Sequence, residues 1–234
     1  GTDDPVAVYC EHFSQWVVED RFPLGRPDFE HDGVEIVADV APYETMKLRL
    51  LNGSHSLLAY AGLARGHRTV ADAMADAELV AFVRTYLDEA AQSLGNETKI
   101  APADYAAALL ARFANDALEH SLVQIASDGS HKLPQRWLSG ALENLDAGRP
   151  IQATAKAVAI WMHYVRGETA DGQSYRVDDP LAARLADCHR QTATPSATVD
   201  ALLSLDDVFS PRLAQNETFR AEVRRAYDRM TTSQ

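Results

Sequence analysis

The sequence predicts a mainly α-helical domain of about eight to ten helices, with a small β element near the amino terminus. Two observations support this fold class. From Pro42 onward, apolar residues recur at the three- and four-residue spacing of amphipathic helices. Beyond Gly66, the single long stretch without helical pattern is 167–178, which is rich in glycine and polar residues.

Composition restricts the class of protein. The chain has 234 residues, of which 46% are hydrophobic and 24% charged, as in ordinary globular proteins, and it is long enough to bury a real core. A net charge of −12 argues against a nucleic-acid partner. The apolar segments are too short to predict a membrane span. Cys10 and Cys188 predict no disulfide framework, which favours a cytoplasmic location.

The first 41 residues predict the β element. Residues 6–10 and 34–38 are rich in β-branched residues and predict two short strands. Between them, 12–20 predicts a short amphipathic helical turn. The stretch 21–33 contains two prolines and two glycines and predicts a loop.

The helical part begins at Pro42, which suits a first helical position because proline lacks an amide hydrogen. The first helix ends near Gly66, and Thr69 with Asp72 predicts a capping box for the next. Asp179-Pro180 and Ser210-Pro211 predict two later helix starts. The remaining predicted helices are 76–94, 102–113, 115–126, 132–146, 151–166, 180–193 and 198–205.

The most informative segment places Lys47, Asn52 and His55 in an otherwise apolar helix. On an α-helix these three side chains fall within a sector of about 140°. Burying an amine, an amide and an imidazole is costly without partners, so a cleft is the cheaper explanation. Lys47 can accept the proton of an alcohol if desolvation lowers its pKa, and the other two can donate hydrogen bonds to the oxygen.

A structural explanation of the same residues stays open from spacing alone. Lys47 can extend its amine to solvent, Asn52 can bend the helix before Gly53, and His55 can be a satisfied core histidine. The histidines show no zinc-binding helix spacing and there is no cysteine pair, so the sequence predicts no metal site.

The segment PYETMKLRLLNGSHSLLAY (42–60) closely resembles the signature region of the long-chain mannitol dehydrogenase and fructuronate reductase family. Supporting family-like segments are 13–22, 128–137 and 175–182, in the expected order. The resemblance implies a helical domain similar to the carboxyl-terminal domain of 6-phosphogluconate dehydrogenase. It implies an NAD(P)-dependent, metal-independent oxidoreductase of polyols or hexuronates, of the mannitol-to-fructose or mannonate-to-fructuronate type.

The resemblance also implies roles for particular residues. Lys47 is the general acid/base, and Asn52 forms an oxyanion hole with an asparagine of another domain. His55 hydrogen-bonds and orients the substrate. Glu44 matches a glutamate that relays protons between the lysine and solvent. One helical turn from Lys47, Glu44 can equally form an ordinary surface ion pair with it.

A second group of residues concerns substrate identity. Lys132 matches a position that contacts substrate hydroxyls or a carboxylate; the alternative is a solvated lysine at a helix start. Gln124 aligns with an arginine of some polyol-acting members, which leaves the substrate open. Arg136 is expected to be a structural or carboxylate-binding cation, and His131 a surface residue.

The sequence lacks the Gly-x-Gly-x-x-Gly fingerprint of a dinucleotide site. By resemblance, residues 1–234 are expected to form the substrate-binding and catalytic carboxyl-terminal domain of a longer enzyme. NAD or NADP would bind mainly to a Rossmann-type amino-terminal domain that this chain lacks, so the chain alone is expected to be inactive. The alternative is a non-catalytic helical module that binds a sugar or a partner.

Overall fold

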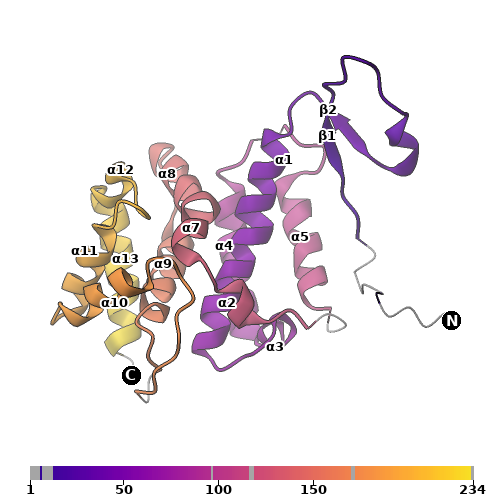
Figure 1. Cartoon of the computed structure of the whole chain (residues 1–234). Helices are drawn as coiled ribbons and strands as arrows, with labels where there is room; N and C mark the ends of the chain where they lie inside the picture. The colour runs from indigo at the N-terminus through magenta and orange to yellow at the C-terminus, as the bar shows by residue number, and fades with distance from the viewer. Residues whose placement is uncertain (1–5, 7–12, 96, 116–118, 170–171, 233–234) are drawn as a thin grey trace.

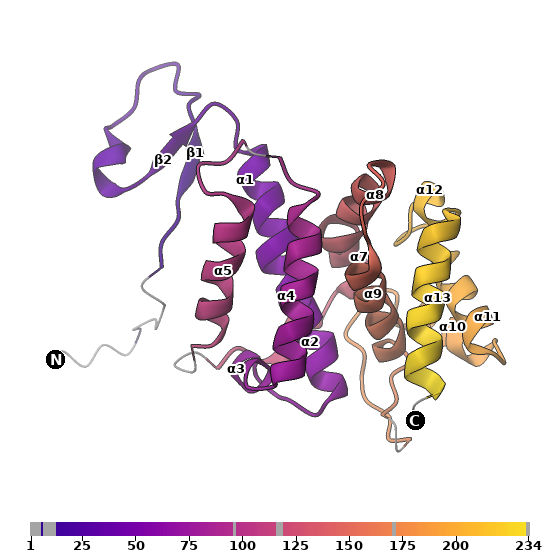
Figure 2. The same cartoon turned by 180° about the vertical axis from the view of Figure 1, so that it is seen from behind.

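The computed structural model describes residues 6, 13–95, 97–115, 119–169 and 172–232 and has the predicted mainly α fold (Figure 1). A small two-stranded sheet lies at one end and α10–α13 lie at the other, as the view from behind confirms (Figure 2). Among the described residues, none of the helices combines the length and apolar character needed to cross a lipid bilayer.

The elements are two strands, one short 3₁₀ helix, two π segments and thirteen α-helices within the described residues. Their bounds are β1 Val17–Glu19, η1 Phe29–Asp32, β2 Glu35–Val37, α1 Ala41–Met46, η2 Lys47–Asn52, α2 Gly53–Ala64, α3 Val70–Met74, α4 Ala77–Ala91, α5 Pro102–Phe113, α6 Leu122–Ile125, α7 Gly129–Leu133, η3 Pro134–Leu138, α8 Ser139–Asp146, α9 Gln152–Tyr164, α10 Ala182–Arg190, α11 Pro195–Leu203, α12 Pro211–Ala214 and α13 Glu217–Thr232.

One prediction for the β element was wrong. The stretch 12–20 was expected to form a helical turn, but within it β1 pairs in parallel with β2, Val18 opposite Ile36. Adjacent β-branched residues such as Val17 and Val18 favour an extended backbone, and the partner strand supplies the hydrogen bonds. Strand 34–38 is confirmed by β2. The predicted strand 6–10 lies outside the described residues except for Val6.

The core is built around α9, which packs against α2, α4 and α13. Both α2 and α9 are buried on nearly every face, as expected for helices that are apolar all round. Tyr60 and Trp161 are among the largest fully buried side chains. The long helix that carries Lys47, Asn52 and His55 therefore continues into the centre of the domain.

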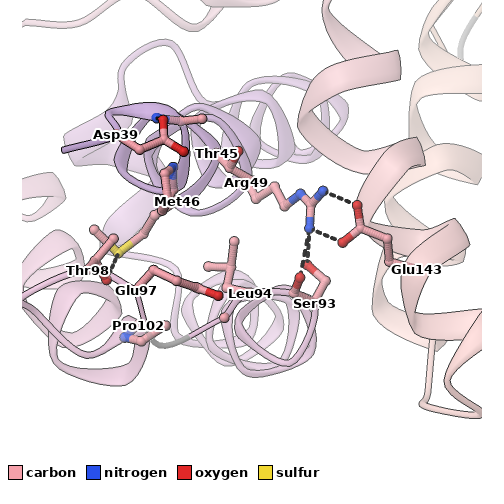
Figure 3. Close-up of a pocket in the computed structure, with 13 residues that line it drawn as sticks. Asp39, Thr45, Met46, Arg49, Ser93, Leu94, Glu97, Thr98, Pro102 and Glu143 are labelled. Carbon is pink, nitrogen blue, oxygen red and sulfur yellow. Dashed lines mark hydrogen bonds and ion pairs between the residues drawn. The ribbon is translucent and has the colours of Figure 1, made fainter. Parts of the chain in front are cut away.

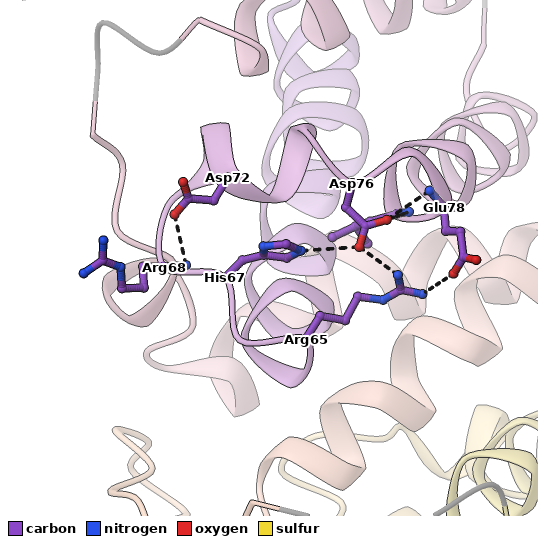
Figure 4. Close-up of polar contacts among 7 residues, drawn as sticks. Arg65, His67, Arg68, Asp72, Asp76 and Glu78 are labelled. Carbon is purple, nitrogen blue, oxygen red and sulfur yellow. Dashed lines mark hydrogen bonds and ion pairs between the residues drawn. The ribbon is translucent and has the colours of Figure 1, made fainter.

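The start of α3 confirms the predicted capping box. Thr69 Oγ1 accepts the Asp72 amide at 3.1 Å, and the Asp72 carboxylate accepts the Thr69 amide at 3.1 Å. In the same region Asp76 caps α4 and binds Arg65 at 2.7 Å (Figure 4). The Leu79 amide and then Arg65 lower the pKa of Asp76 to about 2. These contacts fix the loop after α2.

Other helix boundaries differ from the sequence-based prediction. Residues 115–126 were expected to be helical, but the described part holds only the short α6. Just before α6, the Val70 amide donates to the His120 carbonyl and a β-bridge joins Thr69 to Ser121. Those bonds hold the chain extended, so α6 begins only at Leu122, after its cap Ser121.

Near the carboxyl terminus, α11 begins at Pro195 rather than at 198. The predicted start at Ser210-Pro211 is confirmed, with Ser210 Oγ accepting the Leu213 amide at 3.4 Å. The helix that begins there ends at Ala214, and α13 follows as a separate helix.

Candidate functional site

The residues singled out from the sequence lie on one continuous helix formed by α1, η2 and α2. Met46 and Gly53, which flank η2, both have helical backbone angles. Within η2 the bonding changes to the π pattern, because the Gly53 amide donates to the carbonyl of Leu48, five residues earlier. Such π segments inside α-helices occur frequently at functional sites.

The π segment corrects the expected geometry of the site. On an α-helix, Lys47 and Asn52 would be about 140° apart around the axis. They are the first and last residues of η2, and π bonding joins residues five apart, so one lies about a turn above the other. Lys47 and Glu44 are exposed, whereas Asn52 is partly buried.

His55 faces a different environment from Lys47. Its ring stacks on Phe113 with centroids 4.4 Å apart and lies edge-on to His120 at 6.2 Å. His55, Phe113 and His120 line a cavity of about 70 Å³, whose lining does not include Lys47 or Asn52. In this chain, the exposed amine and the imidazole therefore do not share this cavity.

A second continuous helix, formed by α7, η3 and α8, packs against the first. It also contains a π segment, in which the Ser139 amide donates to the carbonyl of Pro134. Arg136 Nη1 donates to the carbonyl of Asn52 at 3.3 Å and to Ser56 Oγ at 2.8 Å. Thus Arg136 is a structural cation next to the candidate site, one of the two roles expected for it.

Trp137 strengthens this junction. Its indole Nε1 donates to the carbonyl of Gly53 at 3.0 Å. Side chains of the second helix therefore bind two successive carbonyls, those of Asn52 and Gly53, at the end of η2. His131, on the same helix, is exposed as expected, and Gln124 on α6 is also exposed.

Lys132 is held near the surface by its own loop. Its Nζ donates to the carbonyl of Ser127 at 2.6 Å and to its hydroxyl at 3.2 Å, and Asp128 lies 3.9 Å away. Burial, and then the nearby Arg136 charge, lower the pKa of Lys132. Lys132 is therefore a partly desolvated amine rather than a solvated surface lysine.

Two of the family-like segments meet in space. The Asp179 carboxylate accepts the Ser130 amide at 2.8 Å and the Ser130 hydroxyl at 2.7 Å. The Asp128 amide donates to the carbonyl of Asp178 at 2.8 Å. The loop before α10 therefore fixes the start of the helix that carries Lys132. Among the residues described, no three His, Cys, Asp or Glu side chains cluster as metal ligands would.

Arg49 and Tyr86 were not identified from the sequence. Arg49, within η2, is buried and binds Glu143 of α8 and Ser93 after α4 (Figure 3). Tyr86 of α4 donates its hydroxyl to the carbonyl of Arg49 at 2.7 Å. A glycine at position 53 in the middle of a helix was the available signal, because it marks a close approach by another element.

Comparison with known proteins assigns the chain to a protein family. The model described as the mannitol dehydrogenase C-terminal domain matches residues 39–231. The chain belongs to the mannitol dehydrogenase family. The family match begins at Asp39, just after β2 and two residues before α1, and covers the whole helical part that carries the candidate residues.

The chain is similar in sequence to two bacterial oxidoreductases. The chain is 42% identical to an uncharacterized oxidoreductase, YdfI, of Escherichia coli, and 41% identical to the D-mannonate oxidoreductase of the same organism. The alignments cover 97% and 98% of this chain and 47% of each relative. The chain thus spans about half the length of the curated relatives that it matches.

A solved structure confirms the fold. Mannitol 2-dehydrogenase of Pseudomonas fluorescens, in a ternary complex with NAD and D-mannitol, superimposes with a TM-score of 0.86 at 35% identity. That match covers 96% of this chain and 45% of the other chain. The resemblance to the mannitol dehydrogenase family that was inferred from 42–60 is therefore confirmed.

Proposed function

We propose that this chain is the substrate-binding and catalytic domain of an NAD(P)-dependent, metal-independent oxidoreductase that interconverts a polyol or aldonate hydroxyl and a ketone. Family membership and the names of the relatives support the reaction class. The observation that carries the proposal is the placement of an exposed Lys47 one π turn before Asn52 on a helix held by η3.

In this proposal Lys47 moves the proton of the reacting hydroxyl. As an exposed amine at the start of η2, it can reach a substrate lying on the surface of the helix. Asn52 donates from its side-chain amide to the developing oxyanion. His55 lines a separate cavity with Phe113, so the proposal requires the substrate to extend from Lys47 to that cavity if His55 is to orient it. Glu44, which is exposed, exchanges the proton with solvent. Lys132 binds a further hydroxyl or a carboxylate.

The hydride acceptor is proposed to come from another domain. The described residues contain one two-stranded sheet, and its parallel strands are joined by a loop with the short 3₁₀ helix η1 rather than by an α-helix after a glycine-rich turn. They therefore do not fit a dinucleotide, which binds at such a turn. NAD or NADP would accept the hydride when bound to a Rossmann-type amino-terminal domain of the same protein. The choice between the two nucleotides would be made there.

The exposed β element supports the proposal of an amino-terminal domain that packs against it. β1 and β2 project from the helical body (Figures 1 and 2) and precede the region that matches the family. Trp16 and Leu24 in this region are 60% and 100% exposed. A parallel pair of strands is normally part of a larger, covered sheet. We therefore propose that the amino-terminal domain extends this sheet and covers its apolar side chains.

The test uses the protein encoded by the longest open reading frame that contains this sequence. The protein is assayed with mannitol, arabinitol, mannonate and fructuronate as substrates. Lys47→Ala should lower kcat by orders of magnitude while the Kd for NAD(H) or NADP(H) stays within about twofold, because the amine acts on the proton alone. The matched control is Lys99→Ala, which removes another exposed lysine. Undiminished turnover by Lys47→Ala would exclude Lys47 from the mechanism.

The same assay separates the proposal from a non-catalytic module. Substrate binding by the wild-type protein, without turnover with either nucleotide, would support a sugar-binding module instead. Turnover that EDTA abolishes would contradict the metal-independent reaction. The 234-residue chain alone is expected to have no measurable turnover, and the cytoplasmic location stays a prediction.

A further inference from the structure

The hydroxyl of Tyr86 lies between the two π segments. Tyr86 is on α4 and is 1% exposed. Its hydroxyl lies 2.7 Å from the carbonyl oxygen of Arg49 in η2 and 3.3 Å from that of Arg136 in η3. One hydroxyl from a third helix thus contacts the backbone of both segments that flank the candidate site.

The carbonyl of Arg49 accepts this bond because the π segment deprives it of its α-helical donor. In an α-helix the amide four residues later, that of Gly53, would donate to Arg49. In this structure the Gly53 amide bonds to the carbonyls of Leu48 and Leu50 instead. A buried carbonyl that loses its backbone donor needs another, and the Tyr86 hydroxyl supplies it.

Gly53 makes room for this hydroxyl. A Cβ atom at position 53 would lie 2.1 Å from Tyr86 Oη, 3.1 Å from its Cζ and 3.2 Å from the carbonyl oxygen of Arg136. Both the oxygen and the ring that carries it are confined by the core. A side chain at position 53 and a hydroxyl at position 86 are therefore mutually exclusive in this arrangement.

We propose that Tyr86 is a positioning residue that keeps η2 in the π register and thereby keeps Lys47 one turn from Asn52. Without the hydroxyl, the Arg49 carbonyl recovers a partner if the Gly53 amide returns to it, which restores α-helical bonding. That change rotates Lys47 relative to Asn52 by about one residue, or 100°. The proposal rests on the proposed role of Lys47 only for its effect on catalysis.

The register is tested on this chain alone, with Tyr86→Phe and the control Tyr175→Phe. Tyr175 also donates its hydroxyl to a backbone carbonyl, that of Tyr164 at 2.5 Å, but away from η2. Tyr86→Phe should speed amide hydrogen exchange at residues 47–53 by about tenfold or more, and chemical shifts there should move toward α-helical values. Tyr175→Phe should leave these residues unchanged.

A double-mutant cycle adds a readout that simple loss of packing would not give. Gly53→Ala should lower the Tm of the chain strongly when Tyr86 is present. It should lower the Tm much less in the Tyr86→Phe background, because the closest clash involves the missing oxygen. Additive changes in Tm would overturn the mutual exclusion of the two groups.

The consequence for catalysis is measured in the longest protein that carries this chain. Tyr86→Phe should lower kcat by about tenfold to a hundredfold with KM changed less than about twofold, because misplacing a catalytic group affects the reacting step. Tyr175→Phe should retain kcat. Unchanged exchange at 47–53 overturns the positioning role itself. Altered amide exchange with an unchanged kcat overturns the link between Tyr86 and catalysis. A wild-type protein without turnover refutes the proposed function, but the effect of Tyr86 on amide exchange is tested independently of it.

Discussion

The guanidinium of Arg49 binds both carboxylate oxygens of Glu143, at 2.6 and 2.5 Å (Figure 3). The same guanidinium donates to the carbonyl and hydroxyl of Ser93 at 2.8 and 3.0 Å. The Arg49 side chain is 8% exposed and that of Glu143 is 49% exposed. This asymmetric ion pair therefore ties η2 to α8, with the guanidinium buried and the carboxylate reached by solvent.

The asymmetry predicts different costs for the two partners. Arg49→Ala should lower the free energy of unfolding by about 3 kcal/mol, because it removes four hydrogen bonds and the packing of a buried side chain. Glu143→Gln should cost only about 1 kcal/mol, since solvent already screens that carboxylate and Ser93 still binds Arg49. Urea unfolding of the chain measures both free energies.

The control Asp146→Asn disrupts an ion pair with Arg212 in which both side chains are exposed, and it should have no measurable effect. Equal losses of stability for Glu143→Gln and for this control would contradict the prediction.

A second prediction concerns Glu89, a buried carboxylate of α4 that caps the start of α9. It accepts the amides of Ala153 and Thr154 at 2.8 Å each and the Thr154 hydroxyl at 2.6 Å. Glu89→Gln should lower the free energy of unfolding by about 2 kcal/mol, because a neutral amide is a poorer acceptor for amides at a helix start and brings donors of its own. Urea unfolding should show no comparable loss for the control Asp88→Asn, which changes the exposed neighbouring carboxylate.

The helical architecture could be predicted because its signals are local. The bounds of α5 were predicted from Pro102 and the periodicity up to Phe113. The capping box of α3 was predicted from Thr69 and Asp72 alone. In each case a side chain acts on the backbone within a few residues of itself, so no knowledge of the tertiary fold was needed.

The errors have non-local causes. β1 is a strand because β2, about eighteen residues later, pairs with it. Likewise, the extended segment before α6 is held by residues 68–70. The candidate residues could be placed on one helix, but their angular relation could not, because η2 depends on a hydroxyl from α4 and on the fit at Gly53.

A third prediction concerns the amine of Lys132. Burial and then the Arg136 charge lower its pKa, so Lys132 should titrate below the ordinary value for lysine when it is followed by NMR after reductive methylation. Arg136→Gln should raise the pKa of Lys132, because one nearby positive charge is lost, but not to the ordinary value, because burial remains. A Lys132 pKa unchanged by Arg136→Gln would contradict the electrostatic contribution.

The last prediction concerns stability in weak acid. His189 of α10 donates from Nε2 to the carbonyl of Met162 at 2.9 Å, and burial lowers its pKa to about 4. The unfolded chain, with a histidine pKa of about 6.5, therefore binds the proton first as the pH falls. The stability that depends on neutral His189 is complete above about pH 6.5 and is lost as the pH falls to about 4.

The lost stability should amount to about 3 kcal/mol for His189, and His163, whose pKa burial also lowers, should add to it. Urea unfolding at pH 7 and pH 5 should show about 2 kcal/mol of this loss, because the folded-state pKa lies below pH 5. His189→Gln keeps an amide donor for Met162 but cannot bind a proton, so it should be less sensitive to this change of pH than the wild type. The control His131→Gln alters an exposed histidine and should retain the full sensitivity. An equal loss of stability between pH 7 and pH 5 in wild type and His189→Gln would show that this imidazole is not responsible.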